Sequence, residues 1–140
     1  MLSRTGGDVR VDAKPMAAGN REAVRLAIDE FNAGAMGEHF NSVIDARVDY
    51  RDELGELDNR DDVRAYLDEF REMIGGLHVE WEEARELGDT LLLVVNLGGR
   101  GEASGAAVEQ RFTAVMTFEE TRCVRWHFYA NHAEALEVVG

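Results

Sequence analysis

The residues best suited to acid–base chemistry are an aspartate and a tyrosine two positions apart, Asp52 and Tyr50. Alternate side chains of a strand point to opposite faces, so Val48, Tyr50 and Asp52 share one face. The other face carries the charged Asp49 and Arg51, so we expect the first face to point inward. A carboxylate beside apolar side chains loses part of its solvation, which suits a general base. A plainer interpretation stays open, in which Asp52 is an exposed loop-edge aspartate and Tyr50 belongs to an aromatic wall.

Side chains on the later strands could form a cavity around this carboxylate. The residues that we expect to bind a ligand there are Trp81, Gln110, Phe112, Trp126 and Phe128. Gln110 shares a strand face with Phe112, so it either offers an amide inside the cavity or lies at its edge. Because Trp126 and Phe128 are expected to point inward, His127 between them should face outward, as a surface or interface residue.

No motif for a metal or a cofactor is visible. The four histidines lack the spacing of a zinc or iron site, and the lone Cys123 can form neither an internal disulfide nor a thiolate cluster. The glycine-rich stretch Gly98–Gly105 is expected to join two strands, whereas a phosphate-binding loop needs a helix N-terminus behind it. We therefore expect neither a metal nor a cofactor.

The composition is that of one soluble domain with an acidic surface. The 140 residues include 15 Lys and Arg against 28 Asp and Glu, which gives a net charge of −13. Such a field repels phosphate backbones and anionic lipids, so nucleic acid and membranes are poor partners. No run approaches the ~18 apolar residues of a membrane helix, and no secretory signal is visible. A cytoplasmic protein is the default expectation.

The apolar periodicity predicts an α+β fold. We interpret residues 1–19 as a flexible N-terminal tail, after which Asn20 should cap a first helix. A second helix, a strand, a loop at Glu53–Asp58 and a third helix capped by Asn59 or Asp61 follow. Four strands come next, the last two forming a hairpin that closes into a final helix, Ala107–Leu136. Helices followed by consecutive strands indicate a sheet that curls around the helices.

Three segments carry a resemblance to a known family. They are FNAGAMGEHF at the first helix, VDYRDELG after the second, and VEQRFTAVMTF with VRWHFYANHAEAL at the end. From about Asn20 to Val138 the chain resembles the nuclear-transport-factor-2-like superfamily, in its SnoaL-like branch. The resemblance implies a curved antiparallel sheet that forms a cone around the N-terminal helices and encloses an apolar cavity. It also implies a homodimer through the outer sheet face, as in many members.

The relatives include ketosteroid isomerase, limonene epoxide hydrolase, polyketide cyclases and non-enzymatic binding modules. The resemblance matches Asp52 to the catalytic base of ketosteroid isomerase. The two oxyanion donors of that enzyme fall on Ala27 and Ala114, which cannot donate. Since losing one such donor typically costs ~10²–10³ in rate, this isomerisation is disfavoured. The acid that hydrolases and cyclases carry on the last strand falls at or near Phe128.

Two hypotheses about function stay open. The first is a cofactor-free enzyme of isomerase, cyclase or hydrolase type, in which Asp52 is the base, Tyr50 assists it, and the substrate is small and mostly apolar. The second is a non-catalytic module for ligand binding or homodimerisation. A cavity of roughly 300 Å³ or more, with Asp52 facing into it, would favour the first.

Overall fold

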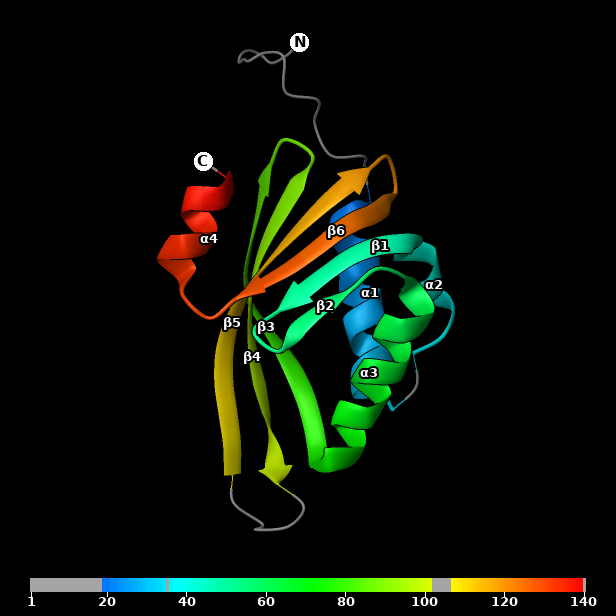
Figure 1. Cartoon of the computed structure of the whole chain (residues 1–140), viewed down its shortest axis with the longest axis vertical. Coiled ribbons are helices and arrows are strands. Elements are labelled where there is room, and N and C mark those ends of the chain that lie inside the picture. Colours follow the sequence, from blue (N-terminus) through cyan, green and yellow to red (C-terminus); the bar gives the residue numbers. More distant parts are fainter. Residues whose placement is uncertain (1–18, 35, 102–106, 140) are drawn as a thin grey trace.

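A computed structural model describes residues 19–34, 36–101 and 107–139, which form an α+β fold (Figure 1). In chain order the elements are α1 (Asn20–Asn32), α2 (Glu38–Val43), β1 (Ile44–Asp52), β2 (Gly55–Leu57), α3 (Arg60–Met73), β3 (Ile74–Leu87), β4 (Thr90–Gly101), β5 (Ala107–Glu119), β6 (Arg122–Tyr129) and α4 (His132–Val139). This order confirms the predicted one with a single addition, the short strand β2 inside the expected loop. Residues 1–18 of the segment 1–19, which we interpret as a tail, and residues 102–105 of the glycine-rich stretch lie outside the described residues.

The six strands form one sheet in the order β2-β1-β6-β5-β4-β3. Every neighbouring pair is antiparallel except β1 and β6, which run parallel. The sheet is therefore mixed, whereas an antiparallel sheet was expected. The register shifts within the pairs β3–β4, β5–β6 and β1–β6. Such bulges increase the local twist and bend a sheet, which lets this one curve around the helices.

The sheet separates two apolar layers. Helices α1, α2 and α3 pack on one side, and α4 lies on the opposite side (Figure 1). On the helix side the core includes Val24 and Val63, both at most 3% exposed. On the other side Leu92 and Val115 pack against Ala135 of α4. The run Leu91–Val95 is therefore buried on both faces, as its continuous apolar sequence predicts.

A side-chain cap marks the start of α3 but not that of α1. Asn59 caps α3 as predicted, because its side chain accepts a hydrogen bond from the backbone N–H of Asp62 at 2.8 Å. The cap predicted at Asn20 is wrong. Gly19 precedes α1, and the buried amide of Asn20 instead donates to the backbone oxygen of Glu120 in the β5–β6 turn, at 2.7 Å.

Glu30 of α1 caps the next helix, α2. Its carboxylate accepts hydrogen bonds from the backbone N–H groups of Gly37, His39 and Phe40, at 2.8 to 3.0 Å. Partial burial raises the pKa of Glu30, but the three donors lower it more, so the pKa lies below its ordinary value. This contact fixes the two helices that close one side of the cavity. None of the described helices is long and apolar enough to cross a membrane.

Candidate functional site

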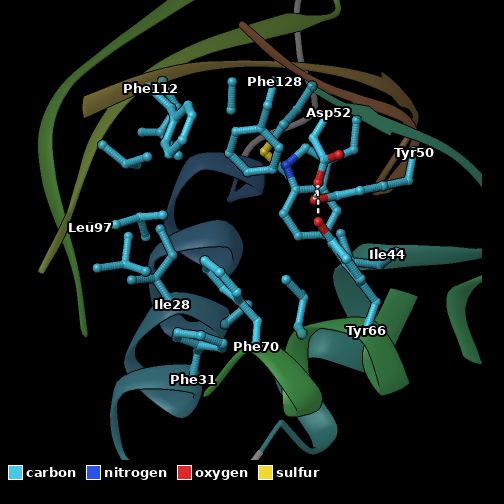
Figure 2. Close-up of a pocket in the computed structure, with 18 of the residues that line it drawn as sticks. Ile28, Phe31, Ile44, Tyr50, Asp52, Tyr66, Phe70, Leu97, Phe112 and Phe128 are labelled. Carbon is cyan, nitrogen blue, oxygen red and sulfur yellow. Dashed lines mark hydrogen bonds between the residues drawn. The ribbon is translucent and has the colours of Figure 1, made fainter. Parts of the chain in front are cut away.

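A cavity of about 330 Å³ lies between the inner face of the sheet and helices α1 to α3 (Figure 2). Apolar side chains from all three helices and from five of the six strands form most of its surface. The two acidic side chains that line it are Asp52 and Glu53, and no arginine, lysine or histidine lines it among the described residues. The acidic groups of the cavity are therefore concentrated where β1 ends.

Asp52 is the best-connected polar side chain of this cavity. Its Oδ2 accepts hydrogen bonds from the hydroxyls of Tyr50 at 2.8 Å and Tyr66 at 2.7 Å (Figure 2). Its Oδ1 accepts from the backbone N–H groups of Leu54 at 2.8 Å and Gly55 at 3.2 Å. A carboxylate has about four lone-pair sites, so this set of four donors suits the ionised form.

The local structure follows from the sequence around Asp52. Strand alternation places Tyr50 and Asp52 on the inner face, as predicted, and Tyr50 is 3% exposed. Asp52 is the last residue of β1 and pairs with Gly55 of β2, so its side chain bonds the turn between the two strands. Helix α3 then brings Tyr66 to the same carboxylate.

Both phenols stay protonated under physiological conditions. Burial raises the pKa of Tyr50, and the nearby negative charge of Asp52 raises it further. The pKa of Tyr66 is raised by burial and by the hydrogen bond that its hydroxyl donates to Asp52. The two hydroxyls therefore keep their protons and can donate to the carboxylate.

An aromatic wall stands beside this cluster. The ring centroid of Tyr50 lies 5.1 Å from that of Trp126 and 5.9 Å from those of Tyr66 and Phe128, in each case edge to face. Phe128 in turn lies 5.5 Å from Trp126 and 6.0 Å from Phe112. Edge-to-face pairs of this kind add ~0.5–1.5 kcal/mol beyond the burial of their area. The wall therefore holds the rings around Asp52 in fixed positions.

The structure brings most of the predicted ligand-binding residues to one cavity. Phe112, Trp126 and Phe128 line it, and so does Gln110, whose side chain is exposed. Trp81 does not line it. This ring lies under Arg25 of α1, with 5.7 Å between the guanidinium and the ring centroid, beside a second hollow on the surface. The prediction that Trp81 lines the cavity is therefore wrong.

Tyr66 is the site residue that the sequence did not single out. Its spacing in the apolar stripe of the third helix predicts only a core residue. The structure does pack Tyr66 against the core, but it also directs the hydroxyl to Asp52. A tyrosine in an otherwise apolar stripe is the available signal, because a buried hydroxyl needs a partner.

His127 faces away from the cavity, as the strand alternation predicts. Its Nε2 lies 3.3 Å from Oδ2 of Asp49, and Arg51 and Arg125 contact the same carboxylate. Burial lowers the pKa of His127 and outweighs the opposing effect of Asp49.

Cys123 is buried, and burial raises the pKa of its thiol, so it behaves as a core residue. No group of three or more potential metal ligands occurs among the described residues.

Solved structures with the same fold cover nearly the whole chain. A protein described as a SnoaL-like polyketide cyclase, from Jannaschia sp. CCS1, is 16% identical over 95% of this chain and 96% of its own, with a TM-score of 0.72. An NTF2-like protein of unknown function from Burkholderia pseudomallei is 18% identical over 87% and 98%, with a TM-score of 0.72. A protein from Catenulispora acidiphila with a ketosteroid isomerase-like fold is 17% identical over 89% and 95%, with a TM-score of 0.67.

At these identities the likeness establishes the fold alone. Among curated protein sequences, none matches the chain significantly. A family model, however, matches most of its length. Residues 8–126 match the SnoaL-like domain, so this chain belongs to the SnoaL-like domain family, whose fold is that of the nuclear-transport-factor-2-like proteins.

Proposed function

We propose that this protein binds a small, mostly apolar ligand in its cavity and uses Asp52 as a general base, without a cofactor. The observation that carries the proposal is the placement of one carboxylate, held by four donors, at one end of a cavity of about 330 Å³ that is otherwise largely apolar. The volume falls in the range of small-molecule sites. A general base in such a position contributes typically ~10²–10⁴ in rate.

The two tyrosines support the base in different ways. To accept a proton, the carboxylate must give up one of its four hydrogen bonds. Tyr50 is buried within the aromatic wall, whereas Tyr66 is half-buried, so Tyr66 is the donor that gives way. Tyr50 then keeps the carboxylate oriented toward the ligand.

The mechanism of ketosteroid isomerase does not transfer to this cavity. Ala27 and Ala114 line it at the positions that the resemblance matches to the oxyanion donors, and Phe128 lines it where other relatives carry an acid. Similar folds do hold small organic molecules. The Catenulispora protein was crystallised with trimethylamine, and a further neighbour, TerC, was co-crystallised with polyporic acid. A ligand of modest size is therefore compatible with the fold.

The base can be tested without knowing the substrate. In the Kemp elimination, 5-nitrobenzisoxazole loses the proton on its ring carbon to a base, the N–O bond breaks, and a coloured cyanophenolate forms. We expect Asp52→Asn to lower this rate ~10²-fold or more. The matched control is Asp49→Asn, which removes an outward carboxylate from the same strand and should leave the rate unchanged. Equal rates for the wild type and Asp52→Asn would refute the base.

A second candidate function is non-catalytic binding of a small ligand. The observation that favours it is that all four lone-pair sites of Asp52 are already occupied. In that case ligands would stabilise the protein against heat, but no Asp52-dependent elimination would be measured.

A further inference from the structure

We infer that the ligand of this cavity is a protonated amine with a small apolar body. The inference rests on the proposed function in one respect, since it takes the cavity to be a ligand site. It goes further by naming the charge and the chemical class of the ligand. Three features of the described residues lead to it.

The first feature is the unbalanced charge. Asp52 lines the cavity as a carboxylate held by neutral donors, and it has no cationic partner among the described residues. The next residue, Glu53, adds a second acid at the same end of the cavity. A charge beside apolar walls is weakly screened, so a cation gains strongly there and an anion is repelled. The net charge of −13 acts in the same direction over the whole surface.

The second feature is the kind of hydrogen bond that the cluster still offers. The lone pairs of Asp52 are taken, but the hydroxyl oxygens of Tyr50 and Tyr66 use only their protons in the two bonds to Oδ2. Each oxygen keeps lone pairs that can accept from a ligand. Donation to a carboxylate polarises a phenol and makes its oxygen a stronger acceptor. The polar end of the cavity can therefore accept hydrogen bonds from N–H or O–H groups of a ligand.

The third feature is the group of rings around this end. Tyr66, Trp126 and Phe128 are half-buried and line the cavity, each within 6 Å of the buried ring of Tyr50 between centroids. Rings set at steep angles to each other offer π faces on several sides of a small group. Clustered aromatic faces next to a carboxylate are the arrangement that recognises ammonium groups. A neutral alcohol satisfies the hydrogen bonds but gains from neither the charge nor the rings.

The test compares three probes of nearly equal size and shape that differ in charge: benzylamine, benzyl alcohol and benzoate. Dissociation constants are measured by calorimetry at pH 7 and low ionic strength with the full chain. We expect benzylammonium to bind at least ~10-fold more tightly than benzyl alcohol, because charge-assisted hydrogen bonds are roughly twice as strong as neutral ones. Benzoate should bind most weakly. Equal or tighter binding of the alcohol or of benzoate would overturn the inference.

The variant Asp52→Asn should remove the preference for the amine and leave the alcohol binding nearly as before, while Asp49→Asn should keep the preference. If Asp52→Asn failed to fold, the three-probe comparison on the wild type would still decide the question. The result also separates two kinds of failure. If the alcohol binds as well as the amine while the Asp52-dependent elimination persists, this inference fails and the proposed function stands. If no probe binds and no elimination occurs, both fail.

Discussion

Replacing Tyr50 by phenylalanine tests the hydrogen bond on which the site depends. The change removes one hydroxyl from a side chain that is 3% exposed, and with it the 2.8 Å bond to Oδ2 of Asp52. Hydrogen bonds to charged groups contribute about 1.5–3 kcal/mol, so we expect Tyr50→Phe to lower the free energy of unfolding by that amount. Urea denaturation monitored by circular dichroism measures it. A loss below ~0.5 kcal/mol, which is typical of a neutral surface change, would refute the reasoning.

A double-mutant cycle isolates the pair from other effects of the substitution. Combined with Asp52→Asn, Tyr50→Phe should cost ~1–2 kcal/mol less than it costs in the wild type, because the charged acceptor is already gone. Tyr66→Phe is the matched comparison, since it removes a donor to the same oxygen from a more exposed ring. Its cost should be smaller than that of Tyr50→Phe. Strict additivity in both cycles would mean that the two hydroxyls contribute nothing through Asp52.

Four further substitutions, one of them a control, test by urea denaturation the elements that surround the site. A Cβ at Gly99 would lie 2.6 Å from Cγ2 of Ile74, so Gly99→Ala should cost ~1–3 kcal/mol, whereas Gly98→Ala, which meets only an exposed imidazole ring, should cost under ~1 kcal/mol. Glu30→Gln should cost ~0.5–2 kcal/mol at pH 7, and the difference from wild type should vanish as the pH falls through the lowered pKa of Glu30. Because folding lowers the pKa of His127, this residue should leave the free energy of unfolding independent of pH above about pH 6.5 and should decrease it as the pH falls further. His127→Gln should remove that decrease.

The part of the site that could be predicted from the sequence is the part set by local geometry. A period of two places Tyr50 and Asp52 on one face of a strand, whatever the sheet around it does. The same rule places Phe112 on the inner face of β5, and Trp126 and Phe128 on that of β6. The hairpin of β5 and β6 is likewise a local structure, with short-range pairing across a tight turn.

The parts that could not be predicted depend on which elements meet in space. Tyr66 reaches Asp52 only because α3 crosses the end of β1, and nothing in the spacing of α3 indicates the strand that it will face. Trp81 lies near the middle of the 14-residue strand β3, where α1 covers the sheet and Arg25 covers the ring. Alternation predicts the face of a side chain, but not whether a cavity or a helix lies above that face. The parallel pairing of β1 with β6 is also a long-range contact.

The resemblance predicts a homodimer through the outer face of the sheet, but α4 covers part of that face. Ala135 of α4 is fully buried against Leu92 and Val115, so this helix covers part of the outer face of β4 and β5. Tyr129 of β6 packs against the same cluster. Elsewhere on the outer face, β1 and the neighbouring part of β6 carry the side chains of Asp49, Arg51 and Arg125, which are 40 to 59% exposed.

This part of the outer face carries Asp49, Arg51, Arg125 and His127, with the three basic groups within 3.9 Å of the carboxylate of Asp49. We predict a two-fold dimer through this surface, in which the same residues of both copies meet. Because each copy carries a net charge of −13, the dimer should become tighter as salt screens the repulsion between the copies. Sedimentation equilibrium measures the association, and Arg125→Glu should weaken it ~10-fold or more, since it adds negative charge at the contact. Arg21→Glu, the same charge change on the exposed surface of α1, should alter it far less. A monomer at all salt concentrations, or equal effects of the two substitutions, would contradict this assignment of the surface.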